Sequence, residues 1–380
     1  MPSAESENNK GAIIMRKLAL ILALALFMTL LCSCDIGDVS EIEDIGSIIG
    51  IGSLSYTPLK DKFELVDHSQ RLPLYYYSYG GDYHFDSFLS RGGADSTASL
   101  VIRLMDLFPD VRLDMGNLGY GCSAFSARDK GGDWVMGRNF DMTASESGTC
   151  LLVHTAPRGG YESLSMVNLG FIGISGKVDS PIDDPSSPLH IAPYLPLDGI
   201  NEKGVSICVL QLNYDPIDAR TLGVKLTPTT IIRNVLDHAY SLESALDIFR
   251  KADLKTEGYA YHFMIADASG KSAVVEYVDN RLEIIYKTGD VLACANQFIS
   301  AKGRSFYKVR EGNESDARVN AIDSAIRSGK FDLKGDKGMD ALLAARVTNT
   351  RWSILYNLSK REMTLCLAGD AQKQFTYSLD

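Results

Sequence analysis

The sequence has no excess of positive charge. It contains 38 Lys and Arg against 48 Asp and Glu, which gives a formal net charge of -10 at pH 7. Proteins that bind nucleic acid through its phosphates need a basic face, so nucleic acid is not expected as a partner. The 380 residues are 45% hydrophobic and 23% charged, which is typical of one or two globular domains with a sizeable core.

The sequence also has no C-x-x-C cysteine pair. Seven cysteines are present, and apart from Cys32 and Cys34 they lie far from one another. Neither a zinc site nor a dense disulfide framework is therefore expected, and we expect no metal and no cofactor. Four cysteines lie in apolar runs, which predicts small buried side chains: Cys150, Cys208, Cys294 and Cys366. Cys122 differs, because glycines and polar residues surround it.

The apolar run at 18–31 is short for a membrane span. It has 14 residues and follows the basic stretch MRK at 15–17, whereas a transmembrane helix needs about 20. This pattern predicts a secretory signal. The run ends in LCSC at 31–34, which resembles a bacterial lipobox and predicts that Cys34 is lipidated. The protein would then be an extracytoplasmic lipoprotein of the bacterial cell membrane; a short transmembrane anchor or a plain cleaved signal is the alternative. Met15 is a second possible start of translation.

Strand patterns dominate after residue 119. The stretches 122–128 and 134–140 predict a hairpin, and 149–155 and 161–168 predict another. Helical spacing is found at 96–108, in a pair of helices over 227–252 broken near Ser241, at 317–329 and at 339–347. Strands are further expected at 204–214, over 261–287 and in a closing hairpin at 350–369. This order predicts an α+β fold of layered sheets flanked by helices.

Cys122 has no histidine tied to it by a motif, although a nucleophilic cysteine needs a base, a positive neighbour and oxyanion donors. The first hairpin would return Arg138 and Asp141 to a point beside Cys122. If the Gly121–Cys122 bond is cut, Cys122 gains an α-amine with a pKa of about 7.7 to 8.0, which suits a general base. Gly121 favours the cut, because glycine can adopt strained backbone angles.

Three motifs together carry a resemblance to a known family. They are Cys122 at the head of a strand, GRNFD at 137–141 and DGINEKGV at 198–205, with EYVDN at 276–280 and WSILYN at 352–357 in support. In these the chain resembles the choloylglycine hydrolase and penicillin V acylase family of N-terminal nucleophile (Ntn) hydrolases. In layout it is most similar to the acyltransferase branch that has a longer propeptide. The resemblance implies a four-layer αββα sandwich.

The resemblance also implies roles for individual residues. Cys122 would be the nucleophile and, after autocatalytic cleavage, the base. Arg138 would favour the thiolate, and Asp141 would orient the new amine. Three further residues would support the site: Asn213 in the oxyanion hole, with Gln211 as the alternative, Asn296 as a second asparagine, and Arg318. The family more often has a threonine where this chain has Ala295.

The expected organisation follows from these assignments. Residues 1–34 would be the signal peptide with its lipobox, and 35–58, acidic and rich in Ile, Gly and Ser, a flexible tether. Residues 59–121 would be a propeptide or N-terminal segment, and 122–380 the catalytic domain. The implied activity is hydrolysis of a linear amide in a small N-acyl substrate, with loops 143–149 and 176–197 choosing among substrates. An acyltransferase, a catalytically inactive binding lipoprotein and a histidine-dependent cysteine peptidase are the alternatives.

Overall fold

A computed structural model describes residues 62–67, 72–111, 120–142, 148–174, 176–178 and 184–379. They belong to one compact unit, Pro58–Asp380. The predicted signal peptide, Cys34 and the tether at 35–58 lie outside the described residues. Among the described helices, none has the length and apolar character that crossing a membrane requires.

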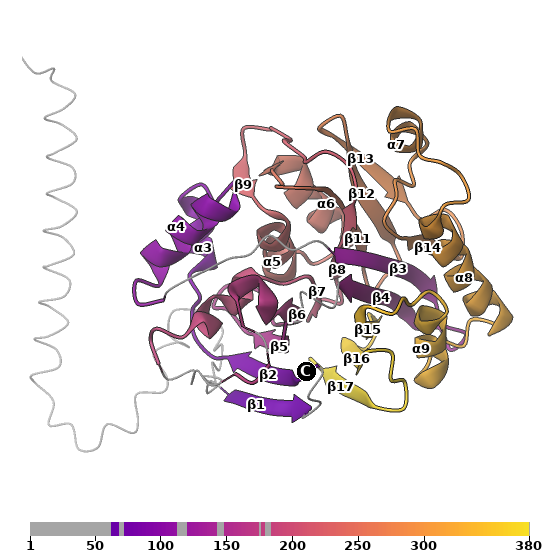
Figure 1. Ribbon diagram of the computed structural model, residues 1–380, viewed down its shortest axis with the longest axis horizontal. Helices are drawn as coiled ribbons and strands as arrows, with labels where there is room; N and C mark the ends of the chain where they lie inside the picture. Colours follow the sequence, from indigo (N-terminus) through magenta and orange to yellow (C-terminus); the bar gives the residue numbers. More distant parts are fainter. Residues whose placement is uncertain are drawn as a thin grey trace, which may run out of the picture. The chain divides into compact units, whose positions relative to one another are not determined.

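Two large sheets form the described unit (Figure 1). The strands of the first are β1 (Lys62–Asp67), β2 (Leu74–Tyr79), β5 (Cys150–Thr155), β6 (Ser163–Asn168), β7 (Asp198–Asn201), β8 (Ser206–Leu212), β11 (Ala260–Ala266), β12 (Ser272–Val278) and β13 (Arg281–Tyr286), adjacent in this order. The strands of the second, in spatial order, are β14 (Val291–Cys294), β3 (Tyr120–Arg128), β4 (Trp134–Met142), β15 (Thr350–Asn357), β16 (Glu362–Leu367) and β17 (Gln374–Ser378). A short parallel pair, β9 (Val224–Leu226) and β10 (Ala252–Leu254), stands apart from both.

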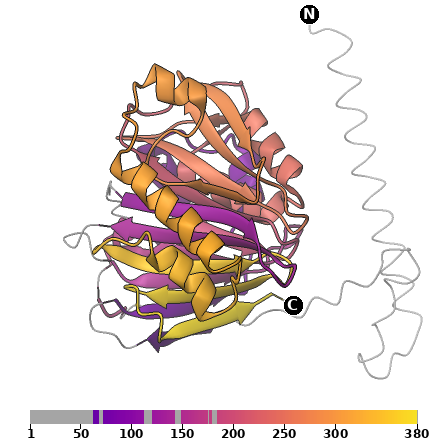
Figure 2. The ribbon, with the colours of Figure 1, turned by 90° about the vertical axis from the view of Figure 1, so that its right-hand side faces the viewer.

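Helices cover the outer faces of the two sheets, and the sheets meet through β3 and β8 (Figure 2). Helices α5 (Pro228–His238) and α6 (Leu242–Lys251) pack on the nine-stranded sheet, and α8 (Glu314–Ser328) and α9 (Asp336–Leu343) on the six-stranded sheet. The remaining helices are α3 (Phe85–Ser90), α4 (Thr97–Leu107), α7 (Ala301–Phe306) and the 3-10 turns η3 (Leu169–Ile172) and η4 (Pro188–Tyr194). The layers therefore run helices, sheet, sheet, helices, in agreement with the predicted α+β class.

Local sequence signals account for most of these elements. Ser241 caps α6 by accepting a hydrogen bond from the backbone N–H of Ser244, as the predicted break near Ser241 requires. The predicted hairpin is also present, since β3 and β4 pair with Cys122 opposite Phe140 and Ala124 opposite Arg138. The sequence did not predict β1, β2, α3 or β17.

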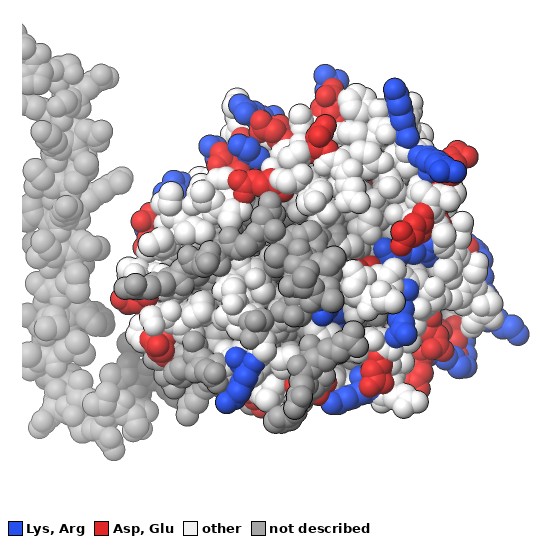
Figure 3. Space-filling view, in the orientation of Figure 1, with Lys and Arg blue, Asp and Glu red and all other residues white. Residues whose placement is uncertain are grey.

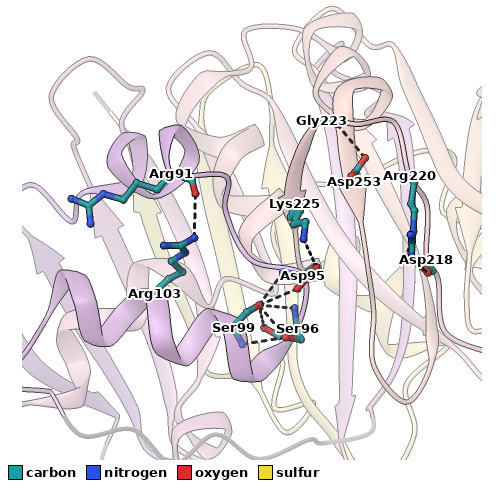
Figure 4. A network of polar contacts seen from close by, with 10 residues as sticks. All are labelled: Arg91, Asp95, Ser96, Ser99, Arg103, Asp218, Arg220, Gly223, Lys225 and Asp253. Atoms are coloured by element: carbon teal, nitrogen blue, oxygen red, sulfur yellow. Dashed lines mark hydrogen bonds and ion pairs between the residues drawn. The ribbon is translucent and has the colours of Figure 1, made fainter.

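The N-terminal segment 62–111 is part of the same fold as the residues that follow Cys122. Strand β2 pairs in parallel with β5, and Leu74, Tyr77 and Phe88 are buried in the main core. Near α4, Lys225 donates to the Asp95 carboxylate at 2.8 Å (Figure 4). Strand β3 runs across the boundary predicted at residue 121, so in the uncut chain the two segments share one strand.

Charged side chains of both signs are interspersed on the face seen in Figure 3, where lysines and arginines stand beside aspartates and glutamates. This distribution gives no single-sign field on that face, and steering of a polyanion needs such a field.

Candidate active site

Cys122 lies in β3 and is fully buried, with 0% of its surface exposed. Its backbone N–H donates to Oδ1 of Asn296 at 2.9 Å. Its Sγ accepts a hydrogen bond from Nη2 of Arg138 at 3.1 Å. Arg138 reaches the thiol because β4 runs antiparallel to β3, so the hairpin returns the chain to Cys122.

Arg138 is held from several sides beneath the thiol. Its Nη1 donates to the Leu197 carbonyl at 2.8 Å and also contacts the Asp198 carboxylate, while Nη2 donates to the Val209 carbonyl at 3.1 Å. The side chains of Arg138 and Asp198 are both fully buried. Burial opposes the charge, but Cys122 and Asp198 raise the pKa of Arg138 above its ordinary value. The guanidinium is therefore a fixed positive charge aimed at the thiol.

A second set of contacts surrounds the Cys122 N–H. Arg318, from α8, donates to Asn296 Oδ1 at 3.1 Å through Nη1 and contacts the Asp141 carboxylate through Nη2. Thr350 donates to the other Asp141 oxygen at 2.6 Å. Asn296 in turn donates from Nδ2 to the Gln211 carbonyl at 2.7 Å. Five of the six residues implied by the resemblance thus meet around one backbone nitrogen and one sulfur: Cys122, Arg138, Asp141, Asn296 and Arg318.

The sixth, Asn213, lies at the edge of a cleft. This cleft has a volume of about 1290 Å³, and Gly121, Asp141, Asn296 and Arg318 line it. Asn213 is exposed there and accepts a hydrogen bond from the Gln211 side chain at 3.1 Å. Gln211 lines the same cleft, so both oxyanion candidates remain available.

The rest of the cleft wall comes from segments that the sequence did not indicate. The described residues of the two expected loops, at 148–149, 176–178 and 184–197, do not line it. The wall is completed by Gly258, Tyr259, Gln297, Asn313, Glu314, Ser315, Arg346, Val347, Thr348 and Asn349. Most of these side chains are polar. The prediction that the loops 143–149 and 176–197 select the substrate was therefore wrong for their described residues at this cleft.

Gly121 separates the buried thiol from the cleft. It lies opposite Asp141 in the β3–β4 register and has no positive φ. A Cβ at this position would meet Asp141 Cβ at 3.4 Å and Asn296 Oδ1 at 3.6 Å, which are ordinary contacts. The sequence-based argument that Gly121 supplies a strained backbone is therefore wrong, since extended backbone here suits any residue.

The buried surroundings of Cys122 favour its neutral thiol form. Burial raises the pKa of Cys122, and this outweighs the opposing influence of Arg138. Arg138 lowers the pKa of Cys122, as predicted, but this effect is smaller than the effect of burial. Burial in low dielectric disfavours the thiolate.

Sequence reasoning missed two supports of this site. Asp198 neutralises Arg138 and also accepts from Trp352 Nε1 at 3.1 Å and from the Tyr356 hydroxyl at 2.5 Å. Thr350 holds Asp141. The motif at 198–205 contained Asp198, but only the stacking of the two sheets places it under Arg138. In the described residues no cluster of His, Cys, Asp and Glu could hold a metal ion.

Part of the chain is similar to a known protein family. Residues 196–372 match the family described as acyl-coenzyme A:6-aminopenicillanic acid acyl-transferase. The match confirms the predicted resemblance to the choloylglycine hydrolase and penicillin V acylase group. No curated protein matches the chain.

Solved structures with a similar arrangement have low sequence identity to this chain. Penicillin V acylase from Agrobacterium tumefaciens is 15% identical, with a TM-score of 0.46 over 65% of this chain and 83% of that one. A mutant of conjugated bile acid hydrolase from Clostridium perfringens is 16% identical, with a TM-score of 0.49 over 68% and 92%. An N-acylethanolamine-hydrolyzing acid amidase ortholog from Caenorhabditis elegans is 15% identical, with a TM-score of 0.42 over 68% and 100%.

Proposed function

We propose that the protein is an autoprocessed cysteine Ntn amidohydrolase that cleaves the linear, non-peptide amide bond of a small N-acyl substrate. The observation that carries the proposal is the double contact of Cys122, whose Sγ accepts from Arg138 at 3.1 Å and whose N–H donates to Asn296 at 2.9 Å. A nucleophile and the nitrogen that would become its base are thus both held by polar side chains. The match of residues 196–372 supports the same class.

Activation would begin at the Gly121–Cys122 bond. The Cys122 sulfur attacks the Gly121 carbonyl, the C–N bond breaks, and the acyl group passes to sulfur. Water then hydrolyses this thioester, which leaves a carboxylate on Gly121 and a free thiol and α-amine on Cys122. Departure of the Gly121 carbonyl would open the thiol to the cleft that Gly121 lines.

Turnover would use the same atoms. The α-amine takes the proton of the Cys122 thiol, and the thiolate attacks the amide carbonyl of the substrate. Asn213, or Gln211 in its place, and backbone donors stabilise the oxyanion. The amine product leaves with the proton from the α-ammonium, and water hydrolyses the thioester to release the carboxylic acid. Arg138 would stabilise the thiolate before its attack and again when hydrolysis of the thioester releases it.

The test is turnover of a panel of N-acyl amides that differ in acyl length and polarity, comparing wild type with Cys122→Ala. Wild type is expected to hydrolyse at least one member with release of acid and amine in equal amounts, and Cys122→Ala to hydrolyse none. Equal rates in the two proteins would overturn the assignment of Cys122. A wild type that stays uncut and is inactive across the panel would favour a binding lipoprotein that retains the fold.

Acyl transfer is the second candidate, because the family that matches residues 196–372 is described by that reaction. In this case a second amine, in place of water, would attack the thioester. Product analysis with an added amino acid such as glycine distinguishes the two: a hydrolase gives mainly acid, whereas an acyltransferase gives mainly the new amide.

We further propose attachment to the bacterial membrane through a lipid on Cys34, on the basis of LCSC at 31–34 after an apolar run. Expression of the full chain and of Cys34→Ser, followed by detergent phase separation, tests this. Wild type should enter the detergent phase and the variant should not; the same partition of both would contradict the anchor.

A further inference from the structure

A buried histidine and glutamate lie behind Asn296, away from the cleft. His262 in β11 and Glu276 in β12 both have fully buried side chains, and His262 Nδ1 is 3.4 Å from Glu276 Oε1. Phe263 pairs with Val275, so the two residues face each other at the next position of the ladder. Burial of charged groups lowers stability unless they are paired and hydrogen-bonded. Further hydrogen-bond partners are therefore expected for His262 and Glu276.

The partner of His262 is the residue before Asn296. Its Nε2 lies 2.7 Å from the carbonyl oxygen of Ala295. A carbonyl can only accept, so Nε2 carries the hydrogen of this bond. The imidazole therefore joins the Ala295 carbonyl to Glu276.

The partners of Glu276 are the residues after Asn296. Its Oε1 accepts from the Ile299 N–H at 2.7 Å, and Oε2 from the Ser300 N–H at 3.2 Å. Burial works to raise the pKa of Glu276, but His262 and the bonds from Ser300 and Ile299 lower it below its ordinary value. A charged carboxylate thus holds the second end of the loop.

We propose that His262 and Glu276 are positioning residues that hold the loop 295–300 at both ends and so fix the Asn296 side chain against the Cys122 nitrogen. Asn296 Oδ1 accepts from Cys122 N and from Arg318, so a shift of the loop changes both contacts. A displacement of about 1 Å in such a site can cost about 100-fold in rate. The catalytic part of this inference rests on the proposed function.

Two substitutions separate the two bonds of His262. His262→Gln keeps a donor near the Nε2 position and can still reach the Ala295 carbonyl. His262→Asn keeps a donor only near Nδ1 and loses that bond. His154→Asn is the matched control, because His154 is a buried histidine between Ser78, at 3.0 Å, and Glu162, at 2.5 Å, and these partners belong to neither set of contacts around Cys122.

The first measurement does not depend on catalysis. In the uncut Cys122→Ala chain, the residue 122 amide retains its bond to Asn296, and its hydrogen exchange can be followed by NMR. We expect exchange about tenfold faster or more with His262→Asn, and within about threefold of the parent with His262→Gln or His154→Asn. Unchanged exchange with His262→Asn, or equal acceleration by His154→Asn, would overturn the proposal.

The second measurement uses the chain with Cys122 intact and a fluorogenic acyl amide of 7-amino-4-methylcoumarin that the wild type hydrolyses. His262→Asn should lower kcat about 10- to 100-fold with KM within about twofold, and His262→Gln should restore most of kcat. An equal loss in both variants would show a merely structural role. If His262→Asn does not fold, Glu276→Gln replaces it in both assays, with faster exchange expected. A wild type inert toward every amide would overturn the proposed function, while the exchange result would still decide the positioning.

Discussion

Two arginines in the described part of the chain are completely buried, and their surroundings differ. Arg138 pairs with Asp198, and Arg233 pairs with Asp237 at 3.1 Å; all four side chains are at most 2% exposed. The other donors of Arg233 go to the hydroxyls of Thr155 and Ser163, at 3.2 and 2.7 Å. Arg138, in contrast, gives one donor to a thiol.

The spaces beside the two pairs differ as well. The Arg138 site adjoins a cleft of about 1290 Å³, whereas Asp237 lines a cavity of about 20 Å³, which is close to the size of one water. Asp237 accepts a hydrogen bond from the Tyr83 hydroxyl at 2.8 Å. Burial raises the pKa of the Asp237 carboxyl and of the Tyr83 hydroxyl. A buried ion pair by itself therefore indicates structure; a reactive group and an adjacent cleft make the first pair a candidate for chemistry.

Replacing each arginine by methionine is the strongest test of this difference. Both substitutions leave a buried carboxylate unpaired, which typically costs about 3 to 5 kcal/mol of stability. Arg138→Met should in addition lower self-cleavage and turnover by more than about three powers of ten, while Arg233→Met should leave the rate per folded molecule within about threefold. Rates normalised to the folded fraction measured by circular dichroism check this. Equal losses of rate would remove the distinction between the two pairs.

The cleft beside Arg138 is lined by the side-chain amides of Asn213 and Gln211. Among the described residues, no Asn or Gln lines the cavity beside Asp237. Asn213→Ala should lower kcat by about two to three powers of ten, the usual effect of removing an oxyanion donor. Steady-state kinetics on any amide that the wild type hydrolyses provide the measurement, with Gln211→Ala as the matched variant. A full rate for Asn213→Ala together with a large loss for Gln211→Ala would transfer the role to Gln211.

Tyr83→Phe tests the structural pair. Loss of a hydrogen bond to a charged acceptor should lower the free energy of unfolding by about 1.5 to 3 kcal/mol, with kcat unchanged. Urea unfolding is best followed in the uncut Cys122→Ala chain, since a cut chain has two parts. A tenfold loss of turnover in Tyr83→Phe, with stability unaffected, would be the opposite of this expectation.

The smallest effect is expected at the exposed contact between Asp95, which precedes α4, and Lys225 in β9. Lys225→Met removes the bond to Asp95 (Figure 4), and exposed ion pairs contribute about 0 to 1 kcal/mol. The same urea experiment should show a shift within that range. A loss above about 2 kcal/mol would mean that this contact holds the N-terminal segment in place as strongly as the buried Tyr83–Asp237 bond.

The contacts that the sequence predicted are the local ones. Arg138 meets Cys122 because one short turn joins β3 to β4, and Ser241 caps α6 because its partner is three residues away. The partners of Arg138 and Asp141 could not be predicted by such reasoning, since Asp198 and Arg318 come from elements 60 and 177 residues away in sequence. Their approach depends on how the sheets stack and where α8 packs.

The burial of Cys122 could not be predicted from the sequence either. Glycines and polar residues surround Cys122 in the sequence, whereas its position between the two sheets leaves it with no exposed surface. The family resemblance identified Asn296 and Arg318; in the structure Asn296 Oδ1 accepts from the Cys122 nitrogen, and Arg318 donates to the same oxygen. The parallel pairing of β2 with β5 had no local signal, because parallel strands are joined by long connections.

The central claim is that Cys122 becomes an N-terminal residue. Intact mass spectrometry of purified wild type and Cys122→Ala, with sequencing of each new N-terminus, tests it most directly. The account predicts that wild type gives a fragment beginning at Cys122 and ending at Asp380, and that Cys122→Ala remains one chain across this bond. A wild type that stays uncut between Gly121 and Cys122 while hydrolysing acyl amides would contradict the account.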